Sequence, residues 1–288
     1  MAFTVPRLDH VVVDLRYAMD EAVRVYRSVG FYLTGRGRHT LGSINHLAVF
    51  DTDYLELLGI DENATAVRPD ILQFPLGLNG LVFATDNADA LFNDLQERDV
   101  PVEEPLAFSR PVRLETGNED AKFRVVRLRA GAVSFGRVYF CEHLTPHLVW
   151  RPEWRQHPNG AMGVAGMLIA ARDPDAASLN FVRMFGPDAA RLGANGARIL
   201  AAGNVRIELV SPKEVKRRLG DAAPDPAGRA DYMASLSIRT ASLAQAAQSL
   251  QIGGIDRARI EPQRILVPAR DAMNVAIQFL EHRPQLGS

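Results

Sequence analysis

The feature that most constrains the fold is a pattern that occurs four times along the chain. A short apolar stretch typical of a buried strand is followed by a stretch with helical spacing and then by strand-like stretches separated by turns. In the first copy the predicted elements are a strand at 8–13, a helix at 16–29 and strands at 31–35, 44–50 and 54–60. Gly30 is expected to end that helix. Each copy is therefore predicted to be a β-α-β-β-β module.

The other copies begin near residues 78, 162 and 231. Asp86 and Thr240 are expected to cap the helices of the second and fourth copies, and Gly186 is expected to end the helix of the third. The first copy shares its closing sequence with the third, and the second shares its own with the fourth. This alternation indicates that the repeating unit is a pair of modules. The sequence predicts an α+β fold in which four modules pair into two tandem domains.

The domain boundaries follow from the positions of the modules. The first domain is expected at 1–145, with modules at 7–60 and 78–143, and the second at 161–288, with modules at 162–212 and 231–283. Residues 146–160 connect them and contain both tryptophans of the chain, Trp150 and Trp154. A flexible tether does not need such side chains, so we expect this connector to pack across the mouth of one domain.

Composition excludes several classes of partner. Lys and Arg total 33 against 34 Asp and Glu, so no overall positive field would attract nucleic acid or an anionic membrane. No apolar run reaches the ~18 residues of a membrane span, and no signal peptide is visible, so we expect a cytoplasmic protein. Gly35 and Gly37 do not form a dinucleotide fingerprint, and no nucleotide cofactor is expected. The expected partner is a small-molecule substrate, and a homodimer is left open.

Three stretches of the first module carry a resemblance to a known family. His10 lies on the first strand, residues 37–45 read Gly-Arg-His-Thr-Leu-Gly-Ser-Ile-Asn, and residues 54–59 read Tyr-Leu-Glu-Leu-Leu-Gly. This pattern resembles the glyoxalase-like branch of the vicinal-oxygen-chelate superfamily, most closely over residues 7–60. The resemblance implies that each module pair curls its strands around a cavity. It also implies a divalent metal held by inward-pointing residues of the first and fourth strands.

The same resemblance indicates which residues would hold the metal. The ligand positions are His10, Glu56, Gly80 and Tyr139 in the first domain, and Gly166, Glu208, Ala234 and Gln278 in the second. Only the first domain keeps a histidine and a carboxylate, a pair that suits Fe, Mn, Zn or Ni. Catalytic sites normally have three protein ligands, so the set is incomplete. The further ligand is expected to be His39, His46 or His143, or else the pocket has lost its metal.

The residues themselves give a separate argument for Glu56. A carboxylate among apolar neighbours costs several kcal/mol if it is buried without a partner, so Glu56 needs water or a cation. Glu208 has Arg206 two residues away as an ion-pair partner. Because side chains alternate along a strand, His10 is expected to face away from Asp9.

The leading hypothesis is a metal-dependent lyase or isomerase of the glyoxalase type that acts on a small oxygenated molecule. His10 and Glu56 would hold the metal or act as acid and base. Arg38, His39, Asn45 and Tyr139 are expected to contact the substrate. One alternative is a ring-cleaving extradiol dioxygenase, although such enzymes carry their ligands in the second domain. An alternative of another class is a metal-free protein that sequesters a small molecule, as resistance proteins of this superfamily do.

Overall fold

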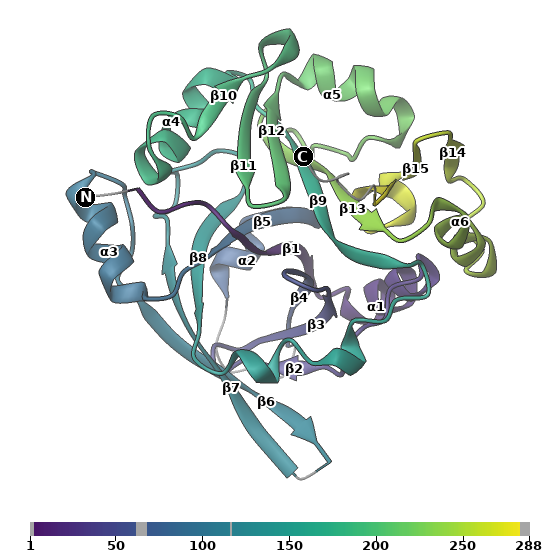
Figure 1. Cartoon of the computed structure of the whole chain (residues 1–288), viewed down its shortest axis with the longest axis horizontal. Coiled ribbons are helices and arrows are strands. Elements are labelled where there is room, and N and C mark those ends of the chain that lie inside the picture. The colour runs from purple at the N-terminus through teal and green to yellow at the C-terminus, as the bar shows by residue number, and fades with distance from the viewer. Residues whose placement is uncertain (1–2, 62–67, 116, 283–288) are drawn as a thin grey trace, which may run out of the picture.

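The computed structural model describes residues 3–61, 68–115 and 117–282, and these residues form two curled sheets of eight strands each (Figure 1). The first sheet contains β1 (Leu8–Arg16), β2 (Gly37–Arg38), β3 (Ser43–Val49), β4 (Tyr54–Ile60), β5 (Gly77–Ala84), β6 (Leu106–Leu114), β7 (Gly117–Arg127) and β8 (Arg137–His143). Its strand order is β2-β3-β4-β1-β5-β8-β7-β6. β1 pairs in parallel with β4 and antiparallel with β5, so the two modules join through their first strands. The outer edges also meet, because the Thr40 amide donates to the Ser109 carbonyl at 3.0 Å.

The second sheet repeats the arrangement of the first. It contains β9 (Ala161–Ala170), β10 (Ala190–Leu192), β11 (Arg198–Ala202), β12 (Val205–Val210), β13 (Tyr232–Thr240), β14 (Arg259–Glu261), β15 (Arg264–Val267) and β16 (Ala276–Glu281). The order β10-β11-β12-β9-β13-β16-β15-β14 is the equivalent one. The predicted α+β fold of two tandem copies is therefore confirmed.

The helices are α1 (Met19–Ser28), α2 (Pro69–Leu72), α3 (Ala88–Glu97), α4 (Pro174–Phe185), α5 (Pro212–Leu219) and α6 (Leu243–Ile252). No helix in the described part of the chain is long and apolar enough to cross a membrane. Two predicted caps are wrong, because Asn87 caps α3 and Ser242 caps α6. A cap must reach the amides of the first turn, which Asp86 and Thr240 stand too early to do.

The predicted strand at 31–35 is also absent from the described structure, where the nearest strand is the short β2. Gly30 has a φ of +94° and turns the chain at the end of α1, as expected of it. The Phe31 amide then donates back to the Tyr26 carbonyl at 3.0 Å. The Phe31 amide is therefore used in the hydrogen bonds that end α1, and the residues that follow do not pair as a strand.

The two sheets share one apolar core. It contains buried residues from both sheets and from α1, α3, α4 and α6, which lie between them (Figure 1). Aromatic rings from the two halves meet directly: Phe31 lies 6.1 Å from Phe279, and Phe83 lies 4.9 Å from Phe185, between ring centroids. The face of each sheet that points away from this core is called its inner face below.

The inner faces of the two sheets are filled differently. In the second sheet, Val215 and Leu219 of α5 pack with Leu168 and Ala234 of the sheet in a separate apolar cluster. In the first sheet, the described part of the corresponding segment contains only the four-residue α2. The inner face of the first sheet therefore encloses a cavity, whereas that of the second is covered by its own helix.

The connector packs against the first half and bonds to the second. The Trp150 ring lies 6.0 Å from that of Tyr54 and 4.6 Å from that of His143, at one end of the first sheet's inner face. The Asn159 carbonyl accepts a hydrogen bond from Thr240 Oγ1 of β13 at 2.8 Å. The connector is thus an ordered part of the core packing.

Asp53 supplies a pH-dependent link between the halves. Its Oδ1 accepts from the Val164 amide of β9 at 2.8 Å, and burial raises the pKa of Asp53 to about 6. Between its ordinary value and pH 6 the folded chain keeps a proton that the unfolded chain releases, so this group lowers the free energy of unfolding as pH rises. Relative to Asp53→Asn, the wild type should lose roughly 3 kcal/mol between pH 4 and 7. Urea denaturation of both proteins measures this, and a pH-independent difference would contradict it.

Candidate active site

The first sheet encloses a cavity of about 160 Å³. Apolar side chains from four strands form one part of its wall: Leu47, Leu58, Phe108, Phe123 and Val125. Polar side chains form another part: His10, His39, Asn45, Glu56, Arg110 and Tyr139. A small cavity that combines an apolar wall with convergent polar groups is typical of a small-molecule site.

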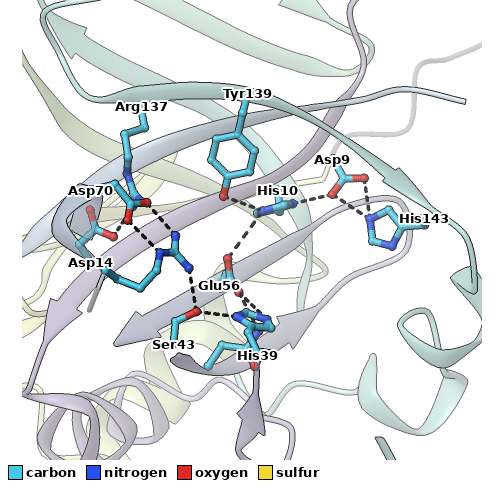
Figure 2. A network of polar contacts seen from close by, with 12 residues as sticks. Asp9, His10, Asp14, His39, Ser43, Glu56, Asp70, Arg137, Tyr139 and His143 are labelled. Atoms are coloured by element: carbon cyan, nitrogen blue, oxygen red, sulfur yellow. Dashed lines mark hydrogen bonds and ion pairs between the residues drawn. The ribbon is translucent and has the colours of Figure 1, made fainter. Parts of the chain in front are cut away.

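An irregularity in β1 determines how His10 is held. The register between β1 and β5 shifts between Leu8 and His10, so Leu8 and Val11 both face the shared core. Asp9 and His10 therefore both turn to the inner face, and the expectation that they face opposite sides is wrong. His10 Nδ1 lies 2.5 Å from Asp9 Oδ1, as Figure 2 shows. Since a carboxylate only accepts, His10 Nδ1 donates the proton in this contact, and His10 Nε2 faces the cavity.

Asp9 also holds a second histidine. His143 Nε2 lies 3.0 Å from Asp9 Oδ2, and the three residues form a continuous row (Figure 2). Burial by itself raises the pKa of Asp9, but His143 and His10 together hold it well below its ordinary range. The carboxylate is therefore ionised and fixes the orientation of the His10 ring.

Glu56 is positioned in a similar way. Its side chain is buried, and its Oε1 accepts from Asn45 Nδ2 at 2.7 Å. The other oxygen, Oε2, lies 3.7 Å from His10 Nε2, and the Tyr139 hydroxyl lies 3.4 Å from the same nitrogen (Figure 2). A ring nitrogen, a carboxylate oxygen and a phenol oxygen thus converge on one place beside the cavity.

This donor set fits a divalent metal. Two ligand atoms that are each about 2.1 Å from one metal lie roughly 3 to 3.5 Å apart, close to the separations seen around His10 Nε2. Asp9 and Asn45 hold the remaining polar atoms of His10 and Glu56, which leaves one atom of each for the metal. Burial raises the pKa of Tyr139 well above its ordinary value, so its hydroxyl is a neutral and weaker donor.

The three histidines considered as further ligands occupy different places. His39 Nε2 is 4.0 Å from Glu56 Oε1 and lines the cavity. His46 is bonded to the Thr34 carbonyl at 2.7 Å and is not part of the cavity wall. His143 is paired with Asp9. Among them, only His39 lies against the pair formed by His10 and Glu56.

A second group of donors lies beside this centre. Ligand atoms of Asp9, Cys141 and His143 lie within 4.8 Å of one another, a grouping that the sequence did not suggest. Burial raises the pKa of the Cys141 thiol well above its ordinary value, and Asp9 already accepts from two imidazoles. A metal in this position would compete with His10 for Asp9, so the two positions are alternatives.

His39 keeps Asn45 in place. Burial lowers the pKa of His39 to about 4, so its ring is neutral at pH 7. Asn45 Nδ2 lies 3.2 Å from His39 Nε2, and His39 Nδ1 lies 2.8 Å from Ser43 Oγ. An accepting Nε2 and a donating Nδ1 satisfy both contacts.

The substrate contacts expected from the sequence divide into two groups. His39, Asn45 and Tyr139 line the cavity. Arg38 instead projects outward, with a side chain 59% exposed, and forms an ion pair with Asp61. The structure thus places Arg38 away from the cavity wall.

An ion-pair network closes the other end of the inner face. Arg137 pairs with Asp14 and with Asp70 Oδ2 (Figure 2). Asp70 Oδ2 also pairs with Arg68 at 2.7 Å. Arg68 Nη1 donates to Ser43 Oγ at 3.0 Å and so joins the network to His39. Burial raises the pKa of Asp14 to about 6, although Arg137 opposes the rise.

Sequence reasoning missed Arg110. This β6 residue is only 3% exposed, and its Nη2 is buried with no hydrogen-bond partner. A signal was present, because Phe108 and Val112 stand two residues to either side and a strand places all three on one face. That pattern predicts an arginine pointing inward.

The equivalent positions in the second sheet carry no free ligands among the described residues. Glu208 is paired with Arg206 at 2.9 Å, as expected, and with Arg218 at 3.1 Å. At Gly166 an added Cβ would lie 2.5 Å from the Arg206 carbonyl oxygen, so a ligand side chain does not fit. Gly80 of the first sheet is similarly restricted, since its Cβ would meet that of Val12 at 2.6 Å.

Known proteins resemble this chain in sequence family and in fold. A glyoxalase-like domain family matches residues 8–185. A hypothetical protein from Staphylococcus aureus superposes with a TM-score of 0.68 at 13% identity, over 96% of this chain and all of the other. A variant of 4-hydroxymandelate synthase from Streptomyces coelicolor does so with a TM-score of 0.62 at 10% identity, over 100% and 95% of the two chains.

A fusion of a xylose isomerase-like TIM barrel with 4-hydroxyphenylpyruvate dioxygenase also has a TM-score of 0.62 at 11% identity, and this chain covers 51% of it. No curated protein matches the sequence. Identities this low show a common fold only. The family match covers more than half of the chain and begins at the strand that carries His10. The chain therefore belongs to the glyoxalase-like domain family of the vicinal-oxygen-chelate superfamily.

Proposed function

We propose that this chain is a divalent-metal-dependent lyase or isomerase that acts on a small oxygenated molecule in the first-sheet cavity. One observation carries the proposal: His10 Nε2 and Glu56 Oε2 lie 3.7 Å apart beside the cavity, with Asp9 and Asn45 holding their other polar atoms. A metal bound there would polarise adjacent substrate oxygens and stabilise negative charge on them.

The side chains around this pair would position the substrate and control protons. The protonated Tyr139 hydroxyl can donate a hydrogen bond to a substrate oxygen bound near His10. Phe108 and Phe123 stack with ring centroids 5.1 Å apart and form an apolar wall. Such a wall limits access of water to a charged intermediate.

A dioxygenase is the second candidate. Its support is the fold shared with 4-hydroxymandelate synthase and with the dioxygenase fusion protein, together with a histidine and a carboxylate that also suit iron. The second sheet argues against an extradiol type, because α5 covers its inner face and Glu208 is already ion-paired. We therefore favour the lyase or isomerase.

Metal content tests the proposal. Protein purified without chelator and incubated with Fe, Mn, Ni, Co or Zn should retain about one metal per chain, and the His10→Ala, Glu56→Gln double variant should retain none. Glu208→Gln in the second half is the matched control and should keep the metal. If the wild type binds none of these ions, the metalloenzyme proposal fails and a metal-free binding protein is favoured. Oxygen uptake by iron-loaded protein on a panel of substrates would favour the dioxygenase.

A further inference from the structure

Arg110 is a buried cation without a counter-ion in contact. No described residue forms an ion pair with it, and its Nη2 has no hydrogen-bond partner, although it lies in the cavity wall. Two other arginines of the cavity wall are neutralised, since Arg68 pairs with Asp70 and Arg137 with Asp14. A buried guanidinium that lacks a partner is costly, so its presence needs an explanation.

Asn45 contributes a second unpartnered atom in the same cavity. Its Nδ2 must face Glu56, because the carboxylate only accepts hydrogen bonds, and this leaves Asn45 Oδ1 as a buried acceptor without a partner. Gly37 makes room for both side chains. A Cβ added there would lie 2.3 Å from Asn45 Oδ1 and 3.0 Å from Arg110 Cδ.

The two unpartnered atoms are complementary in chemistry. Arg110 Nη2 is a charged donor that suits a carboxylate, and Asn45 Oδ1 is an acceptor that suits a hydroxyl. Asn45 also bonds to Glu56 at 2.7 Å, so a ligand held by both would lie directly beside the pair formed by His10 and Glu56. The cavity of about 160 Å³ is similar in volume to cavities that hold a benzene-sized molecule, so the ligand is expected to be small.

We propose that the cavity binds a small hydroxylated carboxylate, with the carboxylate on Arg110 and the hydroxyl on Asn45. This inference rests on the proposed function in placing the substrate beside the metal position. The apolar wall of Phe108 and Phe123 would receive the remaining carbon atoms. Arg110 thereby selects molecules that carry a negative charge, and Asn45 selects those that carry a hydroxyl group.

Calorimetric titration of the chelator-treated full-length protein with three probes tests the proposal. Lactate should bind on the order of tenfold or more tightly than lactamide, which lacks the charge, and than propionate, which lacks the hydroxyl. In Arg110→Met the preference for lactate over lactamide should disappear. In Asn45→Ala the preference for lactate over propionate should disappear. Arg113→Met, an exposed residue on the same strand, should retain both preferences.

The outcomes separate this inference from the proposed function. Equal binding of lactate and lactamide by the wild type, or discrimination that survives in a folded Arg110→Met variant, would overturn the inference even if the protein binds metal. Discrimination in a protein that takes up no metal would support the carboxylate site and refute the metalloenzyme. Circular dichroism confirms that each variant is folded before it is titrated.

Discussion

Asp9→Asn is expected to weaken metal binding about 10- to 100-fold, although Asp9 does not touch the cavity. The ionised carboxylate accepts from His10 at 2.5 Å and from His143 at 3.0 Å. An asparagine can accept from one of these rings, but its amide would then present N–H groups to the other. His10 would lose its fixed tautomer and orientation, and Nε2 would become a poorer ligand. Competition against a fluorescent chelator at pH 7 measures the change.

Asp14→Asn is the matched control for this prediction. Asp14 lies on the same strand and the same inner face, but it pairs with Arg137 and makes no contact with His10. Its replacement should leave metal affinity within about twofold.

A third variant, Cys141→Ser, distinguishes the two possible metal positions. The substitution should leave metal affinity unchanged if the metal is held by His10 and Glu56. It should weaken metal binding if the metal is held by Asp9, Cys141 and His143. Unchanged affinity in a folded Asp9→Asn variant would refute the positioning role.

Phe83→Ala should lower the free energy of unfolding by about 3–5 kcal/mol. The ring is fully buried and contacts Phe140 of its own sheet, at 5.7 Å between centroids, and Phe181 and Phe185 of α4, at 6.3 and 4.9 Å. The truncation therefore opens a cavity between the halves. Because both halves share this core, we expect a single unfolding transition with a lower midpoint.

Urea denaturation followed by tryptophan fluorescence and by circular dichroism tests this expectation. Trp150 and Trp154 report on the connector, whereas circular dichroism reports on both sheets. Leu106→Ala, a residue 38% exposed on β6, is the control and should change the stability by less than about 1 kcal/mol. Two separated transitions in the wild type would show that the halves unfold independently.

The fold was largely predictable because its determinants are periodic. Alternating and helical apolar patterns recur in all four modules, and the sheets and helices follow them. The wrong predictions concern local details, in which either of two adjacent residues could take the same role. Asn87 rather than Asp86 caps α3, because only Asn87 places its side chain beside the Ala90 amide. Such choices depend on a shift of one residue, which periodicity does not determine.

The site was predictable in part. The family resemblance brought His10, Glu56 and Tyr139 together as ligand positions, and the structure places them side by side. The role of Asp9 could not be seen, because it depends on an irregularity in the pairing of β1 with β5. The partner of Glu56 was not predicted either, since Asn45 reaches it diagonally from the neighbouring strand β3, and this depends on the pairing register.

Helix α5 gives the second half a property that the first lacks. Its Val215 and Leu219 occupy the inner face that is hollow in the first sheet. Helix α5 is covalently linked to the sheet that it covers. Its effective concentration at that face is therefore on the order of millimolar or higher and does not change with the protein concentration. A soluble molecule of modest affinity could not displace it. The inner face of the second half is therefore occupied by its own chain whatever the concentration of other molecules.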